Sequence, residues 1–162
     1  MASIALTSGK FNFSYFEKLL LVILVVFSLI PVWSNKYFIT GDGPCHLYNS
    51  KVLLDFITSH NLDFYDDYYV LNKNLDPNWF SHITLALLLS FLPDFLAEKI
   101  FVSAYIILFA VGLRWLLKTI NKENAFLVLL GFSFIFHHAF QMGFFNYSFS
   151  FVFFFFSVGY WL

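Results

Sequence analysis

The chain has 162 residues, of which 60% are hydrophobic, 23% aromatic and only 12% charged, and its formal net charge is -1. Soluble domains are about 45–50% apolar, so this composition predicts an all-α protein that crosses a membrane several times. It gives no support to a nucleic-acid partner, because no basic patch or stripe is present. The single cysteine, Cys45, cannot form an internal disulfide.

The first apolar run is LLLVILVVFSLIPVW, residues 19–33, which together with Phe16 predicts a membrane-spanning helix over about 16–34. Lys10 and Lys18 flank its beginning. A cleaved signal peptide is the competing interpretation. The segment PVWSN lacks the small residues of a cleavage site, and Trp33 is bulky, so we expect an uncleaved helix.

Residues 35–78 form a polar loop that is too long to be a passive connection between two spans. Within it, HLYNSKVLLDFI places apolar residues at helical spacing, which predicts a short amphipathic helix lying on the membrane surface. Pro44 suits the first turn of that helix. Gly41 and Gly43 are expected to form the turn that leads into it.

Residues 79–92, WFSHITLALLLSFL, are apolar but short. About 14 residues cover about 21 Å as a helix, whereas the hydrocarbon core is about 30 Å thick, so an interfacial helix is predicted. Residues 96–117 are long enough to cross. They end near Arg114, Lys118 and Lys122, a basic cluster that the positive-inside rule places in the cytoplasm.

The remaining chain continues this alternation. We expect a cytoplasmic turn at 118–124, an outward span at about 125–140, an external turn at 137–146 and an inward span at about 147–162. The loop 35–78 and the turn 137–146 then lie on the same, external side. The chain stops at FSVGYWL inside an apolar run, which predicts that it is part of a longer protein.

Asp42 and His46 are the first candidates for a functional site. They are four residues apart, and they face one point if the helix after Pro44 includes His46. A carboxylate and an imidazole placed in this way can share a metal ion or a proton. The alternative makes Asp42 a turn residue, since Asp-Gly is a common turn dipeptide, and His46 an interfacial side chain.

Three further histidines are candidates for binding substrate. His82, in the predicted interfacial helix, is either a donor to an anionic headgroup or an amphipathic side chain at the water boundary. His137 and His138 lie near the end of a span, where ionisable groups are costly unless they face water or the bundle interior. Adjacent residues point to different faces of a helix, so at most one of this pair is expected to reach Asp42.

Lys51 and Lys73 are two of the three cations in the acidic loop, together with Lys36. Lysines in such a position can hold a phosphate, or they can simply be solvated or extend to lipid headgroups. No Walker loop, Rossmann fingerprint, nucleophile elbow or zincin helix is present in the sequence. Cytosolic nucleotide chemistry is therefore not supported.

Three segments carry a family resemblance: TGDGPCHLYNSKVLL, DPNWFSHITLALLLSFLP and MGFFNYSFSFVFFFFSVGYWL. They resemble the N-terminal part of the GT-C fold glycosyltransferases, the group of protein mannosyltransferases and aminoarabinose transferases, in a bacterial branch. The resemblance implies a GT-C-like transmembrane bundle with juxtamembrane helices in a large first external loop. Asp42 falls where the family carries its catalytic or metal-associated aspartate. Many relatives have a second acid in the next external turn, whereas this chain offers His137, His138, Gln141 and Asn146.

The resemblance implies transfer of a sugar from a polyprenyl-phosphate donor to an acceptor outside the bacterial inner membrane. Asp42 then acts as general base or holds a divalent cation, Mg or Mn, and His46 assists at the phosphate. The expected substrate-binding residues are Lys51, Lys73, His82, His137, His138 and Asn146. The alternative is a non-enzymatic membrane scaffold or a transporter fragment. Transporters favour polar groups at the bilayer midplane, whereas here these groups gather at one interface.

Overall fold

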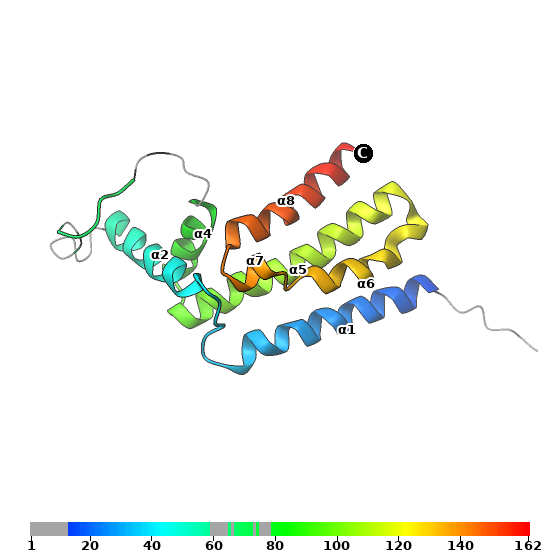
Figure 1. The fold of residues 1–162 in the computed structure, drawn as a ribbon, viewed down its shortest axis with the longest axis horizontal. Helices are drawn as coiled ribbons and strands as arrows, with labels where there is room; N and C mark the ends of the chain where they lie inside the picture. The colour runs from blue at the N-terminus through cyan, green and yellow to red at the C-terminus, as the bar shows by residue number, and fades with distance from the viewer. Residues whose placement is uncertain (1–12, 59–64, 66, 73, 75–78) are drawn as a thin grey trace, which may run out of the picture.

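The computed structural model describes residues 13–58, 65, 67–72, 74 and 79–162. The regular secondary structure of this part of the chain is all helical, with no strand, so the all-α prediction is confirmed (Figure 1). In chain order the helices are α1 (Phe13–Ser34), α2 (Gly43–Thr58), α4 (Trp79–Leu89), α5 (Asp94–Ile120), η1 (Lys122–Leu127), α6 (Val128–Gly131), η2 (Phe132–Phe134), α7 (His138–Gln141) and α8 (Phe145–Trp161).

Two helices of the described chain, α1 and α5, are long and apolar enough to cross a membrane, at the positions where the sequence predicts spans. Only 17% of the apolar window of α1 is buried. Large side chains such as Val26 and Phe27 are 55% and 65% exposed. Continuous apolar surface of this kind is costly in water and suits contact with lipid. The fold is thus consistent with an α-helical membrane protein.

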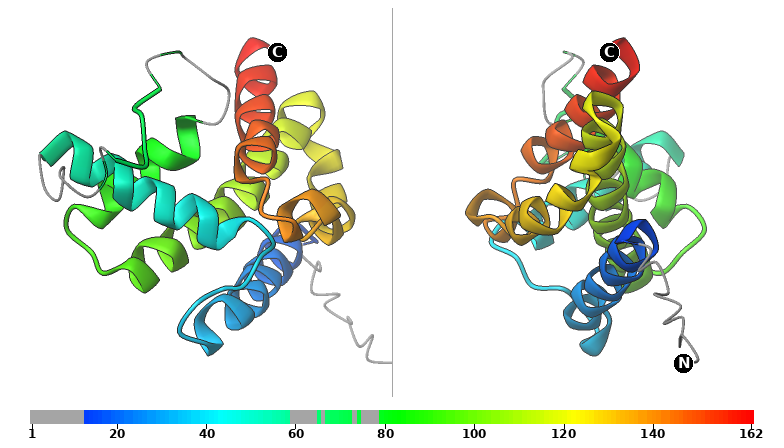
Figure 2. Two further views of the ribbon diagram at one scale, coloured as in Figure 1. Left: turned by 60° about the vertical axis from the view of Figure 1, so that its left-hand side comes forward. Right: turned by 90° about the vertical axis from the view of Figure 1, so that its right-hand side faces the viewer.

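The long elements alternate in direction (Figure 1). Helix α5 runs antiparallel to α1, the segment 122–134 runs back alongside it, and α8 runs in the direction of α5. Helices α2 and α4 pack against each other at the end where α1 finishes and α5 begins (Figure 2). We call this end, formed by residues 40–58, 79–92 and 137–146, the cap. With 11 residues, α4 covers only about 16 Å, so it is too short to cross a membrane, as predicted.

The segment 125–140, predicted as a span, is not one regular helix in the structure. Residues 122–134 are helical, but the chain alternates between 3₁₀ and α geometry through η1, α6 and η2, and a separate short helix, α7, follows. One local cause is Ser133, whose hydroxyl donates to the Leu130 carbonyl at 2.7 Å in competition with regular backbone bonding. Because 3₁₀ geometry rises about 2.0 Å per residue, this segment covers about 24 Å instead of about 20 Å.

The core lies between α5 and α8 and is largely aromatic. Tyr105, on α5, is completely buried and stacks on Phe140 of α7, with 4.6 Å between the ring centroids. Its hydroxyl donates to the Ile135 carbonyl at 3.0 Å, so the only polar atom of the side chain is satisfied. These contacts fix the position of residues 135–140 on α5, and with them the turn that enters the cap.

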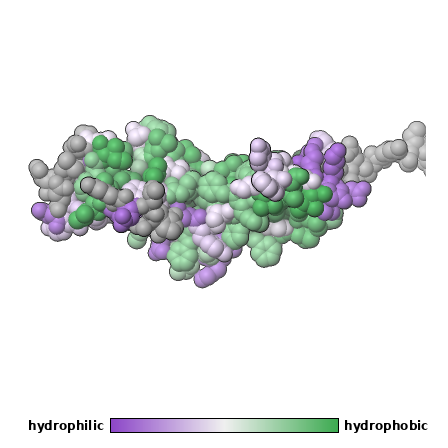
Figure 3. All heavy atoms as spheres, turned by 90° about the horizontal axis from the view of Figure 1, so that it is seen from above, coloured by the Kyte–Doolittle hydropathy of each residue, from purple (hydrophilic) through white to green (hydrophobic). Residues whose placement is uncertain are grey.

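The opposite end of the bundle is charged. Figure 3 shows apolar surface along the bundle and a group of polar residues at the right-hand end of the view. Here Arg114 donates to Glu17 through Nε at 2.9 Å and through Nη2 at 3.0 Å, which joins α1 to α5. Glu17 is only 2% exposed. We call this end, with Glu17, Arg114 and Lys118, the ion-pair end.

Candidate functional site

The turn that contains Asp42 is bound through backbone hydrogen bonds to the turn that follows α7. Gly41 N donates to the Gln141 carbonyl at 3.0 Å, and Asp42 N donates to the Met142 carbonyl at 2.9 Å. Gly143 follows with φ +86°, and a Cβ at this position would lie 2.6 Å from Asp42 N. Only glycine combines this dihedral with so close an approach of two chains.

Helix α2 begins directly after Asp42, as the sequence predicts. Gly43 N donates to the Thr40 hydroxyl at 3.1 Å, and His46 N donates to the Asp42 carbonyl at 3.0 Å. Asp42 thus closes the first turn with its main chain alone. Its carboxylate is exposed and makes no hydrogen bond with any described residue. The charged group therefore remains available to a ligand.

His46 and His82 form a pair that joins α2 to α4. His46 Nδ1 lies 3.0 Å from His82 Nε2, so one nitrogen donates and the other accepts. The His46 ring also packs against Phe145 at the start of α8, with 5.5 Å between centroids. The structure therefore brings three of the predicted residues, Asp42, His46 and His82, into one region of the cap.

Both histidines of the pair are neutral at neutral pH. Burial lowers the pKa of His46, and the Asp42 carboxylate and a hydrogen bond with the Gly143 backbone oppose this only in part. Burial also lowers the pKa of His82, and the neighbouring His46 acts in the same direction. A neutral pair explains how two imidazoles can lie in contact without repulsion.

Asn146, a predicted substrate-binding residue, joins two parts of the cap. Its side-chain oxygen accepts from Ser81 N at 2.9 Å, and its nitrogen donates to the Ser81 hydroxyl at 2.8 Å. Ser81 is completely buried. The amide thus holds the beginning of α4 against the beginning of α8, one residue from His82.

Of the two lysines predicted to bind substrate, Lys51 is not brought to Asp42. Lys51 lies on another face of α2, where it lines a separate cavity with Tyr37, Asp94 and Glu98. Lys73 lies outside the described residues.

His137 and His138 line a different hollow. His137 Nδ1 accepts from Phe140 N at 3.2 Å and so caps α7. Together with the exposed His138, it borders an apolar groove of about 1020 Å³ that has Phe134 and Phe154 among its walls. This groove runs between η2, α7 and α8, away from the histidine pair.

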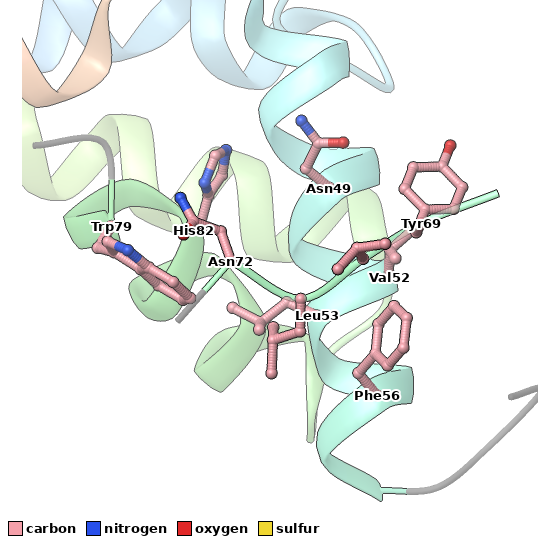
Figure 4. Close-up of a pocket in the computed structure, with 10 residues that line it drawn as sticks. Asn49, Val52, Leu53, Phe56, Tyr69, Asn72, Trp79 and His82 are labelled. Atoms are coloured by element: carbon pink, nitrogen blue, oxygen red, sulfur yellow. The ribbon is translucent and has the colours of Figure 1, made fainter. Parts of the chain in front are cut away.

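A second cavity lies directly beside the pair. It has a volume of about 340 Å³ and lies between α2, residues 69–72 and the start of α4 (Figure 4). His82 belongs both to the pair and to this cavity. The other aromatic and polar residues that line it are Asn49, Phe56, Tyr69, Asn72 and Trp79.

Trp79, Tyr69 and Asn49 were not among the residues that the sequence predicted to bind substrate. The Trp79 indole nitrogen donates to the Asn74 carbonyl at 2.6 Å, which fixes the ring at the cavity. Spacing contained part of the information, since Asn49 and Phe56 are seven residues apart and share a face of α2. That this face of α2 packs near Trp79 and His82 could not be predicted from the sequence.

The side chains around Asp42 can be set against the ligands that the expected divalent cation prefers. Among the described residues there is no group of three or more His, Cys, Asp or Glu side chains placed to hold a metal ion. Mg²⁺ prefers six oxygen ligands, whereas this region offers the single carboxylate of Asp42 beside two imidazoles whose facing nitrogens contact each other. The described side chains do not fit a cation held by the protein alone.

Comparison with protein-family models, with curated proteins and with solved structures finds no match to this chain. Its chemistry must therefore be inferred from its own geometry. That geometry combines a free carboxylate, a neutral histidine pair and a cavity at one end of a helical bundle.

Proposed function

We propose that this chain is the N-terminal part of a membrane glycosyltransferase of the GT-C fold. The reaction transfers a sugar from a polyprenyl-phosphate donor to an acceptor outside the bacterial inner membrane. The observation that carries this proposal is the exposed Asp42 carboxylate, which has no hydrogen bond with a described residue, at the exit of a long apolar helix and beside the histidine pair and its cavity. The resemblance of the segments around Asp42, Trp79 and Gly143 to that family supports it.

In the proposed reaction Asp42 is the general base. Its carboxylate accepts the proton of the acceptor hydroxyl while the hydroxyl oxygen forms a bond to the anomeric carbon of the sugar. The bond from that carbon to the phosphate oxygen breaks, and the polyprenyl phosphate leaves with the electron pair. No metal ion enters this sequence of steps.

The histidine pair stabilises the leaving phosphate. When His46 Nδ1 donates to His82 Nε2, the Nδ1 atom of neutral His82 carries a proton and can donate to a phosphate oxygen. His82 lines the cavity, so it is the member that meets the substrate. His46 acts through His82 as a positioning residue.

The bundle supplies the apolar environment for the donor's lipid. The groove bordered by Phe134 and Phe154 is open along the helices and apolar over most of its length, so an isoprenoid chain lies there while the sugar lies in the cap. This arrangement keeps the reacting groups in water and the chain in the bilayer.

The test is Asp42→Asn. Asparagine accepts the same turn geometry but lacks the negative charge, so we expect transfer to fall about 10²- to 10⁴-fold without loss of folded protein. The measurement is transfer from a radiolabelled polyprenyl-phosphate sugar by membranes containing equal amounts of each variant of the full-length protein.

Asp67→Asn is the matched control, because it removes one exposed carboxylate from the same loop. It should leave the rate unchanged. Near-equal rates for wild type and Asp42→Asn would remove Asp42 from the catalytic site.

A further inference from the structure

We propose that the cavity between α2 and α4 binds one uncharged sugar ring, so that the transferred sugar is neutral and not an amino sugar or a uronic acid. This inference rests on the proposed function and specifies its substrate class. It is carried by the size of the cavity, by the chemistry of its walls and by its contact with the histidine pair.

The size of the cavity suits a single ring. Its volume of about 340 Å³ is near the lower limit of small-molecule sites, which range from about 300 to 1,000 Å³. Val52 and Leu53, 5% and 9% exposed, form a firm apolar floor on α2. A longer saccharide exceeds this space unless its other units extend out of the cavity.

The walls have the two kinds of surface that a sugar ring presents. A pyranose has an apolar face of C–H groups and an edge of hydroxyl groups. Trp79 and Phe56 offer aromatic surface from opposite sides of the cavity (Figure 4). Asn49 offers a carboxamide with two donors and one acceptor, and it has no hydrogen bond with a described residue.

The cavity lining carries no formal charge among the described residues. It contains no Asp, Glu, Lys or Arg there, and His82 is neutral because burial lowers its pKa. An ammonium or carboxylate group that lies against this lining loses water without gaining a charged partner among the described residues, which costs more than burying hydroxyl groups that find partners. The described lining therefore selects against charge.

The position of the cavity connects it with the reaction. His82 contributes one ring to the histidine pair and to the cavity lining at the same time. A sugar in the cavity thus has its phosphate-bearing carbon on the side of the pair and of Asp42.

The experiment compares donors that share one polyprenyl phosphate and differ in the sugar. Mannosyl and glucosyl donors are neutral, the 4-amino-4-deoxyarabinosyl donor is cationic and the glucuronosyl donor is anionic. We expect kcat/KM for the better neutral donor to exceed that for either charged donor by about tenfold or more. A wild-type preference for a charged donor would overturn the inference.

The variant Asn49→Asp tests the location. It adds a carboxylate to the lining at an exposed position of α2, so it should raise the use of the cationic donor relative to the neutral one by about tenfold. Asn35→Asp is the matched control, because Asn35 is exposed near the same end of the bundle but does not line the cavity. The same ratio of cationic to neutral donor use in both variants as in wild type would place the sugar elsewhere.

Failure of the proposed function is distinguishable from failure of this inference. Absence of transfer from all four donors would refute the glycosyltransferase proposal. The cavity is then tested by tryptophan fluorescence with methyl mannoside as the probe. A response that disappears in Trp79→Phe supports the sugar site, and no response in wild type overturns it.

Discussion

The two ends of the bundle use carboxylates in opposite ways. At the ion-pair end, the Glu17 carboxylate is almost completely buried and both of its oxygens are occupied by Arg114. At the cap, the chain near Asp42 is held by backbone bonds to Gln141 and Met142, and the carboxylate itself is exposed. Of these two carboxylates, only that of Asp42 is exposed to a ligand. This comparison is why we assign chemistry to the cap.

The largest effect on stability is expected at the ion-pair end. Arg114→Met leaves Glu17 buried without a partner, so the free energy of unfolding should fall by about 3 kcal/mol. Denaturant unfolding in detergent micelles measures this change, and transfer per folded molecule should be preserved.

The double variant Glu17→Leu with Arg114→Met serves as the control. It removes both charges and should recover most of the lost stability. A double variant as unstable as Arg114→Met would show that the contribution of Arg114 does not come from its pairing with Glu17.

At the cap, we expect one substitution, Gly143→Ala, to lower both stability and transfer activity. Gly143→Ala places a Cβ close to Asp42 N at a positive φ, so we expect a loss of about 2 kcal/mol and displacement of the Asp42 turn. Thermal unfolding and the transfer assay measure the two consequences in one preparation.

Gly112→Ala is a suitable comparison. Its Cβ would first meet the ring of Phe156, and Gly112 lies within α5, outside the cap and outside the lining of the groove and of the cavity. If both alanine variants behaved alike in transfer, the close contact at Gly143 would have no special role at the site.

The smallest effect is a dependence of stability on pH at the histidine pair. Burial lowers the pKa of His46 and His82 below the ordinary value of 6.5, so the unfolded chain binds more protons as the pH falls through 6.5. Stability should be fully present above about pH 6.5 and decrease as the pH falls toward the lowered values. Unfolding curves between pH 8 and 5 measure this decrease.

The double variant His46→Gln with His82→Gln removes both titrating groups, so its stability should change less over the same range. An equally steep decrease in the double variant would assign the pH dependence to other residues.

The long elements could be predicted because their determinants are local. The apolar run before Ser34 and the helix after Pro44 follow from composition and spacing within one segment, and the structure confirms both. The same holds for α4, whose length alone shows that it cannot span. The division of the predicted span 125–140 into several short helices was not foreseen, because hydrophobicity does not distinguish α from 3₁₀ geometry.

The candidate site was only half predictable. Asp42 and His46 were found because they are neighbours in sequence, but the partner of His46 is 36 residues away and depends on how α2 packs on α4. At most one of His137 and His138 was expected to reach Asp42, and the structure shows His137 capping α7 instead. Gly143 was not identified, because its need for glycine comes from the approach of a chain segment 100 residues earlier.

That separation also determines the order in which the site is assembled. Asp42 leaves the ribosome long before Met142, whose carbonyl holds it, and at about 5 to 20 residues per second the delay is roughly 5 to 20 s. During this interval α1 and the Asp42 turn have been synthesised, but the Met142 carbonyl that binds the turn has not. Each new chain therefore carries the Asp42 carboxylate before the backbone bond that positions it can form, and the turn is complete only after Met142 has been synthesised.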